Sequence, residues 1–262
     1  MKRTYITFTL TCITAAIFAQ PKIIAHRGYW KTEGSAQNSV TSMEMTAKHK
    51  LYGCEFDVWQ TIDGILVCNH DGVIDGIRIE DTPYSKIQYC KMGNGELIPT
   101  VAQYLREATK YPQLKMILEI KTHKNNERNA QVVENVIRLV RELGIQEQVE
   151  YIAFSQFICE YLHQLEPQAK IAYLNGDRTP KEIKDMGLSG IDYRYSVYDK
   201  YPTWAQEAKA LGLEVNVWTV NNEQELIKFS TNPYIDLITT DEPLTLKQIL
   251  KKGKKKRKHK NN

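Results

Sequence analysis

Short apolar runs alternate with longer amphipathic segments through most of the chain. The runs have the length of β-strands, and the segments between them repeat apolar residues with the period of a helix. The predicted strands cover residues 22–28, 53–61, 114–121, 149–155, 170–175, 190–195, 214–220 and 235–240. The predicted helices cover residues 39–50, 100–110, 127–143, 156–165, 180–186, 203–211, 223–229 and a last helix from 244. Eight strands that alternate with eight helices, without a linker, predict one α/β domain, a (β/α)8 TIM barrel over residues 20–250.

The connection after the second strand is longer than the others. A turn at Asp63-Gly64 leads to a brief extended piece over 65–69, and residues 71–98 are rich in Gly and Asp without a sustained period. This stretch is too long for an ordinary connection and predicts a small functional insertion in the barrel. The competing architecture is a doubly wound open sheet, but that fold usually has fewer strands and a Gly-rich phosphate loop, which this sequence does not contain.

Residues 1–19 have the pattern of a secretory signal peptide. Lys2 and Arg3 give a positive start, and an apolar core follows from about Tyr5 to Phe18. This pattern predicts a periplasmic or secreted protein from which the signal peptide is removed. The cysteines that follow residue 19 have no CxxC spacing that would indicate zinc: Cys54, Cys68, Cys90 and Cys159. We interpret them as buried free thiols in a compartment that permits disulfides.

The chain ends in a strongly basic tail, predicted over residues 251–262. Residues 251–260 contain eight Lys or Arg, and without them and the Lys2-Arg3 pair the chain has 25 Lys and Arg against 31 Asp and Glu, a net charge near −6. Such a tail is typical of a solvated, disordered segment. It either makes weak contact with an anionic membrane surface or simply stays in water. Nucleic acid is a poor partner, because the body is acidic and export is expected.

Paired carboxylates lie at the ends of two predicted strands. Glu55 and Asp57 are spaced i, i+2, so both side chains lie on the same face of the second strand. Two like charges on an inward face need a cation between them, and a divalent Mg²⁺ or Ca²⁺ ion suits oxygen ligands. Glu119 and Lys121 end the third strand and add a third carboxylate and an ammonium group for an anionic substrate. The alternatives are that Glu55 faces a helix and pairs with a lysine, and that Glu119 pairs with Lys121.

Two histidines also end extended segments. His26-Arg27 follows the first strand, and His70 closes the extended piece after the second strand. A lone histidine usually has a structural role, but two of them at strand ends beside paired carboxylates indicate a site at a barrel mouth. Trp218, on the seventh strand, either packs against a glycerol or sugar face at this mouth or belongs to the core. Asp241, after the eighth strand, either caps the last helix or contacts a ligand.

These residues resemble the signature of the glycerophosphodiester phosphodiesterase family, and the resemblance covers nearly the whole chain after residue 19. The signature is His-Arg, then Glu-x-Asp, then His, which stands here as His26-Arg27, Glu55-Phe56-Asp57 and His70-Asp71. Supporting pieces are Thr61-x-Asp63-Gly64, Leu118-Glu119-Ile120-Lys121, Val217-Trp218-Thr219-Val220-Asn221 and Ile238-Thr239-Thr240-Asp241-Glu242-Pro243. Family members are barrels with an insertion after the second strand, which agrees with the pattern of residues 71–98.

The resemblance implies metal-dependent cleavage of a glycerophosphodiester into glycerol 3-phosphate and an alcohol. One divalent cation, Mg²⁺ or Ca²⁺, would be held by three carboxylates: Glu55, Asp57 and Glu119. The cation would polarise the phosphoryl group and offset its developing charge. His26 and His70 would be the general acid and base, because imidazole titrates near neutral pH. Arg27 and Lys121 would bind the phosphate.

One departure from the family pattern concerns Gln37. Many family members have Pro-Glu-Asn-Thr in the loop after the first strand, and this chain has Ala36-Gln37-Asn38-Ser39. Gln37 keeps the size of a glutamate but not its charge. We therefore expect Gln37 to bear on substrate binding and on the choice of the leaving alcohol more than on the class of reaction.

Two other functions are compatible with the same residues. One is a lysophospholipase D or phospholipase C-like activity that cuts intact lysophospholipid or phosphoinositide and stops at a cyclic phosphate. Product analysis separates this activity from the leading one. The other is a barrel that binds a glycerophosphoryl group without cleaving it, which the missing charge at Gln37 motivates.

Overall fold

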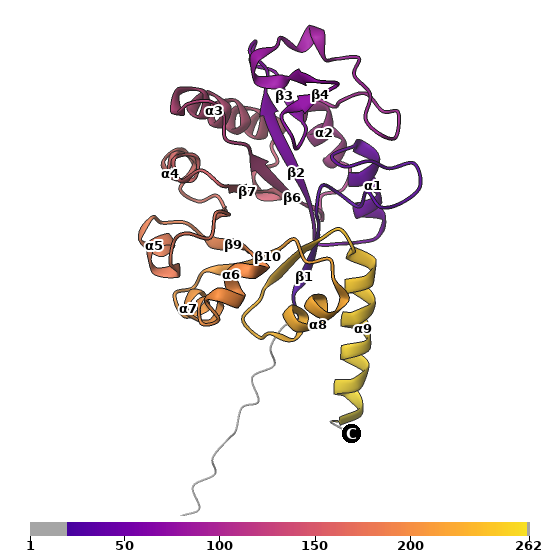
Figure 1. Cartoon of the computed structure of the whole chain (residues 1–262), viewed down its shortest axis with the longest axis vertical. Coiled ribbons are helices and arrows are strands. Elements are labelled where there is room, and N and C mark those ends of the chain that lie inside the picture. The colour runs from indigo at the N-terminus through magenta and orange to yellow at the C-terminus, as the bar shows by residue number, and fades with distance from the viewer. Residues whose placement is uncertain (1–19, 261–262) are drawn as a thin grey trace, which may run out of the picture.

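Eight parallel strands close into a barrel within residues 20–260, the part of the chain described by this computed structural model, with side chains as far as Lys254 (Figure 1). The barrel strands are β1 (Lys22–Ala25), β2 (Gly53–Gln60), β6 (Lys115–Ile120), β7 (Val149–Ala153), β8 (Ile171–Tyr173), β9 (Gly190–Arg194), β10 (Glu214–Trp218) and β11 (Leu237–Thr240). The first strand pairs in parallel with both β2 and β11, which closes the sheet. The predicted (β/α)8 barrel is therefore confirmed.

Helices surround the barrel and connect successive strands (Figure 1). They are α1 (Val40–Lys48), α2 (Val101–Ala108), α3 (Asn126–Leu143), α4 (Gln156–Leu165), α5 (Pro180–Asp185), α6 (Tyr195–Lys200), α7 (Trp204–Ala210), α8 (Glu223–Thr231) and α9 (Pro243–Lys260). Thr100 and Thr179 start α2 and α5 with capping boxes, in which the threonine and a residue three positions later satisfy each other's backbone N–H groups. The short helix α6 directly follows β9 and was not predicted.

The alternation of side chains along β2 separates the outer core from the barrel interior. Phe56 and Val58 are buried in the apolar layer between the strands and the helices, where the Phe56 ring lies 4.8 Å from that of Tyr104. Glu55 and Asp57 occupy the alternate positions and point the other way. The lower part of the barrel interior is filled by a small apolar cluster: Ile24, Ile117, Ile152, Leu174 and Leu237. The carboxylates of Glu55 and Asp57 therefore lie on the inward face of β2, the face that also borders this cluster.

The insertion after β2 has more structure than its sequence predicted. β3 (Leu66–Cys68) pairs antiparallel with the end of β2, and β4 (Val73–Ile74) forms a hairpin with β5 (Ile77–Arg78). Two 3₁₀ turns follow, Ile79–Asp81 and Tyr84–Lys86. A separate apolar cluster holds the insertion together: Val67, Ile79, Ile87 and Ile98. The absence of a helical or strand period in the sequence follows from the shortness of these elements.

Two predictions concern the ends of the chain, the signal peptide and the disordered tail. The predicted signal peptide, residues 1–19, lies outside the described residues. The prediction of a disordered tail from 251 differs from the structure, in which the backbone of α9 stays helical to Lys260. Lys and Arg have high helix propensity, and a helix that starts on packed residues such as Leu246 extends at little cost. Among the helices of residues 20–260, none is both long and apolar enough to cross a membrane.

The cysteines agree with their interpretation as free thiols. Cys54, Cys68 and Cys159 are buried, and Cys90 is partly buried. Burial raises the pKa of the Cys54 thiol to about 12, so this side chain stays neutral and behaves as a small apolar group.

Candidate active site

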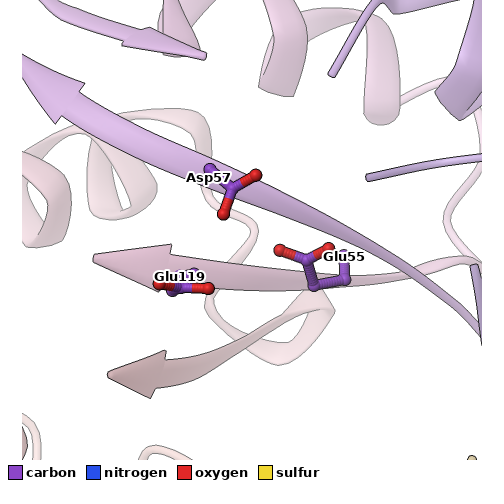
Figure 2. Close-up of side chains that lie close together, drawn as sticks. All are labelled: Glu55, Asp57 and Glu119. Atoms are coloured by element: carbon purple, nitrogen blue, oxygen red, sulfur yellow. The ribbon is translucent and has the colours of Figure 1, made fainter. Parts of the chain in front are cut away.

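Three carboxylates meet inside the mouth of the barrel. The backbone register places Asp57 of β2 beside Glu119 of β6, and Glu55 lies two positions earlier on β2. Carboxylate oxygens from the three residues lie within 4.8 Å of one another, and all three residues are buried. Figure 2 shows the three side chains turned toward a common space. The i, i+2 spacing therefore does bring Glu55 and Asp57 to one face, as the sequence predicted.

The negative charges of these three carboxylates are only partly offset by groups of the protein itself. Burial, and then the neighbouring carboxylates, raise the pKa of Glu55 well above its ordinary value and that of Glu119 to about 7. Glu55 Oε2 accepts a hydrogen bond of 2.6 Å from the backbone N–H of Arg27. Glu55 Oε1 is buried and has no hydrogen-bond donor, and buried Glu119 Oε1 has only the Lys121 ammonium beside it. Buried acceptor atoms of this kind fit a hard divalent cation with oxygen ligands.

Lys121 lies beside the carboxylate cluster and not apart from it. Its ammonium nitrogen is 2.7 Å from Asp57 Oδ1 and also 2.7 Å from Glu119 Oε1. The Glu119–Lys121 ion pair, which the sequence left open as an alternative, is thus present together with the cluster. Burial alone would raise the pKa of Asp57, but the Lys121 ammonium outweighs it and holds this pKa below its ordinary value.

Asn38 completes the surroundings of Asp57, and sequence reasoning missed it. Its Nδ2 donates to Asp57 Oδ2 at 2.8 Å, and its Oδ1 accepts from the Asp57 backbone N–H at 3.0 Å. The residue is buried and has a φ of +61°, a left-handed conformation that asparagine tolerates better than most residues. The signal in the sequence was an Asn directly after Gln37, in a loop that leaves the first strand.

Arg27 and Gln37 form a second polar pair at the mouth. Arg27 Nη1 donates to Gln37 Oε1 at 2.6 Å, and its Nε lies 3.7 Å from Asp57 Oδ2. Arg27 Nε is buried and has no hydrogen-bond acceptor. Gln37 therefore contacts the arginine and not the carboxylate cluster. Gly28 makes the turn between them, because a Cβ atom there would lie 2.2 Å from Ser42 Oγ.

His26 is fixed by a carboxylate on the neighbouring barrel strand. Its Nδ1 lies 2.8 Å from Asp241 Oδ1, which also accepts from Trp30 Nε1 at 3.0 Å. Asn221 Nδ2 donates to the other carboxylate oxygen at 2.6 Å. Burial opposes ionisation of Asp241, but the hydrogen bonds, first of all that of His26, lower its pKa to about 2. An ionised Asp241 holds the proton on His26 Nδ1 and leaves Nε2 as the nitrogen for chemistry.

His70 lies on the other side of the mouth, at the start of the insertion. Its Nδ1 is 2.7 Å from Asp71 Oδ1, and its carbonyl oxygen accepts a hydrogen bond from Trp59 Nε1. Burial lowers the pKa of His70, although the charge of Asp57 works against this shift. His70 and Trp30 line the same pocket of about 460 Å³ between the loop after β1 and the insertion. Trp30 thus shares a pocket with His70 and donates to the carboxylate that contacts His26.

Trp218 ends β10, where it has the core contacts that the sequence left open as one alternative and also borders a pocket. Its ring packs edge-to-face on Phe154 at 5.5 Å and against the apolar cluster inside the barrel, and its Nε1 donates to the Asp192 carbonyl. The same residue lines an open pocket of about 650 Å³ together with Asn221. Trp218 thus lines a pocket at the mouth and also packs against the apolar cluster inside the barrel.

Comparison with known proteins agrees with this geometry. Residues 26–245 match the family model described as the Glycerophosphoryl diester phosphodiesterase family. The matched residues include the three carboxylates of the cluster and both histidines. The chain belongs to the glycerophosphoryl diester phosphodiesterase family. The family and the enzyme class inferred from the sequence signature are therefore confirmed.

Individual relatives share this fold over most of their length. A glycerophosphodiester phosphodiesterase from Caldanaerobacter subterraneus subsp. tengcongensis is 23% identical over 245 residues, which cover 88% of this chain and 98% of that protein. The crystal structure of a glycerophosphodiester phosphodiesterase from Parabacteroides distasonis is 39% identical with a TM-score of 0.87, covering 89% and 98% of the two chains. A phosphodiesterase from Oleispira antarctica, solved with the product sn-glycerol-3-phosphate, is 20% identical with a TM-score of 0.77, covering 88% and 97%.

Proposed function

We propose that the protein hydrolyses glycerophosphodiesters to glycerol 3-phosphate and an alcohol. The observation that carries this proposal is the buried group of three carboxylates, in which Glu55 Oε1 has no donor, at the mouth of a barrel of this family. The relative from Oleispira antarctica was solved with sn-glycerol-3-phosphate, the product expected here. The binding-only alternative is disfavoured, because proton-transfer groups and phosphate-binding groups surround the same cluster.

The cation is proposed to be a single Mg²⁺ or Ca²⁺ ion, held by Glu55, Asp57 and Glu119. When bound, it supplies polarisation of the phosphoryl oxygens and offsets the charge that develops on them. Lys121 keeps Asp57 ionised before any ion binds, so at least one carboxylate is ready as a ligand near neutral pH.

Arg27 and Lys121 are proposed to bind the phosphodiester. The unpartnered Nε of Arg27 is buried and is free to donate to a phosphate oxygen. Gln37 fixes the guanidinium through Nη1 without neutralising it. Lys121 adds a second positive charge on the far side of the carboxylate cluster.

His26 is proposed as the general base and His70 as the general acid. Because Asp241 holds the Nδ1 proton of His26, Nε2 accepts the proton of the attacking hydroxyl, and the imidazolium that forms faces an ionised carboxylate. The attacking group is the neighbouring glycerol hydroxyl, and the bond that breaks joins phosphorus to the oxygen of the leaving alcohol. His70 gives that oxygen its proton, and water then opens the cyclic phosphate to glycerol 3-phosphate.

The two pockets beside the mouth give the substrate its orientation in this proposal. The pocket of about 460 Å³ opens on His70 and receives the leaving alcohol. The wall formed by Trp218 receives the glycerol face, because an indole ring offers apolar area to the carbon skeleton.

The test is turnover of a soluble glycerophosphodiester with added Mg²⁺ or Ca²⁺, compared with the same assay after chelation. Phosphorus NMR of the product separates glycerol 3-phosphate from an accumulated cyclic phosphate. The His26→Ala variant should lose activity, and His163→Ala, a histidine on α4 away from the mouth, should keep it. Equal rates for wild type and His26→Ala would refute the catalytic role.

A further inference from the structure

Five lysines from three separate parts of the chain line one groove at the amino-terminal end of the barrel. They begin β1, precede β2 or lie on α9: Lys22, Lys50, Lys247, Lys251 and Lys254. The groove has a volume of about 500 Å³, and none of the residues that line it is acidic. We call these five side chains the basal lysine groove.

The charges of the basal lysine groove are not paired. Other lysines at the same end of the barrel form ion pairs, as Lys170 does with Glu150 and Glu214 and Lys209 does with Asp236. None of the five groove lysines has an ion-pair partner among the side chains described up to Lys254. Lys22 lies over the Tyr52 ring at 4.3 Å, and Lys247 donates to a backbone carbonyl. All five are exposed, so their charge faces the surroundings.

The helix α9, which carries three of these lysines, continues beyond the groove. Figure 1 shows this helix running along one side of the molecule and past its lower end. Residues 255–260 add five more Lys or Arg to the helix. Residues 20–250 are acidic, with a net charge near −6 even when Lys22, Lys50 and Lys247 are counted. Positive charge is thus concentrated at one end of a body of opposite sign.

Apolar side chains lie next to this charge. Ile227 on α8 is 45% exposed, and with Ile249 and Leu250 it lines a hollow on the neighbouring face of α9. Gln20 lies beside these residues, and its Nε2 donates to the Leu250 carbonyl at 2.9 Å. A lipid surface takes up both positive charges and apolar side chains, whereas nucleic acid is bound mainly through charge.

We propose that the basal lysine groove and α9 bind an anionic phospholipid surface. The lysines lie near the lipid phosphates, and Ile227 and Ile249 approach the acyl region. Each lysine close to such a surface adds a favourable contribution, so a group of this size is sufficient for reversible binding. The acidic body is repelled by the same surface and stays in water.

This placement sets the direction of the catalytic mouth. The groove lies at the amino-terminal ends of the barrel strands, and His26, Asp57 and Glu119 lie at or toward their carboxyl ends. A barrel bound through the groove turns its mouth away from the lipid. The substrate class that fits is then a water-soluble, deacylated phosphodiester and not an intact lipid of the same surface, an inference that rests on the proposed function.

The experiment uses the chain from Gln20 onward, because every described strand and helix follows this residue. Its sedimentation is measured with vesicles of phosphatidylcholine that contain roughly one third phosphatidylglycerol, and with vesicles of phosphatidylcholine alone. Binding is expected only to the anionic vesicles and should be lost in about 1 M salt, where the Debye length falls to about 3 Å. Equal sedimentation with the neutral vesicles would overturn the proposal.

Charge-reversal variants locate the surface. The triple variant Lys50→Glu, Lys251→Glu, Lys254→Glu should bind anionic vesicles at least about tenfold more weakly. The control Lys86→Glu, Lys184→Glu, Lys200→Glu makes the same change of net charge at exposed lysines elsewhere, and it should retain most of the binding. Thermal unfolding checks that both variants are folded. An equal loss in both variants, or wild-type binding to duplex DNA but not to vesicles, would overturn the proposal.

Turnover tests the orientation separately. Bound wild type should cleave a soluble glycerophosphodiester at the same rate with and without anionic vesicles, and it should not cleave lysophospholipid placed in those vesicles. Cleavage of the vesicle lipid would refute the orientation and leave the binding surface intact. If no phosphodiester is cleaved under any condition, the proposed function fails, while vesicle sedimentation still decides on the basal lysine groove.

Discussion

The imidazole of His26 and the carboxylate of Asp241 are joined by a contact of 2.8 Å, although 215 residues separate them in the chain. Parallel pairing of β1 with β11 brings the two strand ends together. Trp30 Nε1 donates to the same carboxylate oxygen and Asn221 Nδ2 donates to the other, so three side chains fix the orientation of the carboxylate. Asp241 therefore contacts His26, Trp30 and Asn221, and it positions the imidazole that we propose as the general base.

We predict that Asp241→Asn lowers kcat by about a hundredfold or more, because the amide no longer stabilises the imidazolium form of His26. KM should change much less, since Asp241 does not touch the phosphate in the proposed arrangement. Steady-state kinetics over a range of pH provide the measurement. The control is Asp71→Asn at the other histidine, where the carboxylate is 79% exposed and a smaller loss is expected. Equal losses in the two variants would contradict the assignment.

We predict that a divalent cation stabilises the wild type and not Glu55→Gln. Saturating Mg²⁺ or Ca²⁺ should raise the Tm of the wild type by about 5 °C or more. Without metal, Glu55→Gln should be at least as stable as the wild type, because burial and its carboxylate neighbours already disfavour a charge at this position. Calorimetry with and without chelator measures both effects. Glu33→Gln, an exposed carboxylate in the loop after β1, should behave as the wild type.

We predict that Gln37→Glu raises KM several-fold with little change in kcat. A carboxylate at this position would pair with Arg27 Nη1 and neutralise part of the charge that binds the phosphodiester. Gln37→Ala should also raise KM, since the guanidinium loses its support. A Gln37→Glu variant with higher kcat and unchanged KM would show instead that the position acts on the chemical step.

We predict that Asp192 makes the folded protein less stable as the pH rises. This residue lies inside the barrel on β9, and one of its oxygens is buried without a donor. Burial raises its pKa from 3.8 to about 8, so the folded state binds a proton that the unfolded state releases, and stability falls between these two values. Asp192→Asn should be more stable than the wild type by about 1 kcal/mol or more at about pH 9 and by less at about pH 6. Denaturant unfolding at both pH values measures this difference, with exposed Asp185→Asn as the control.

The sequence predicted those parts of the site that depend on one strand at a time. Period-two alternation was enough to place Glu55 and Asp57 on the inward face, because Phe56 and Val58 supply the outward one. The alternating strand pattern also predicted the barrel, since parallel strands of this number can bury their outer faces only under helices.

Contacts between distant strand ends were beyond the sequence. His26 contacts Asp241, and Asn38 donates to Asp57. Both contacts depend on the paths of loops that leave the barrel, and the local hydrophobic pattern of the sequence does not predict those paths. The same holds for the β3 pairing in the insertion, where three residues are too few to show an alternation. In the tail, composition indicated disorder, whereas the helix is continued from packed residues of α9.

The antiparallel pairing of β3 with β2 fixes the start of the insertion separately from its remaining residues. The backbone N–H of Asn69 donates to the carbonyl of Asp57 at 3.1 Å. This hydrogen bond holds the residue directly before His70 against Asp57, a proposed metal ligand. Residues 71–98, the remainder of the insertion, follow this hydrogen-bonded position in the chain. Changes in residues 71–98 can therefore alter the pocket beside His70 while the distance between His70 and the proposed metal ligands is kept, so the rim of the mouth and the proposed reaction centre can vary separately.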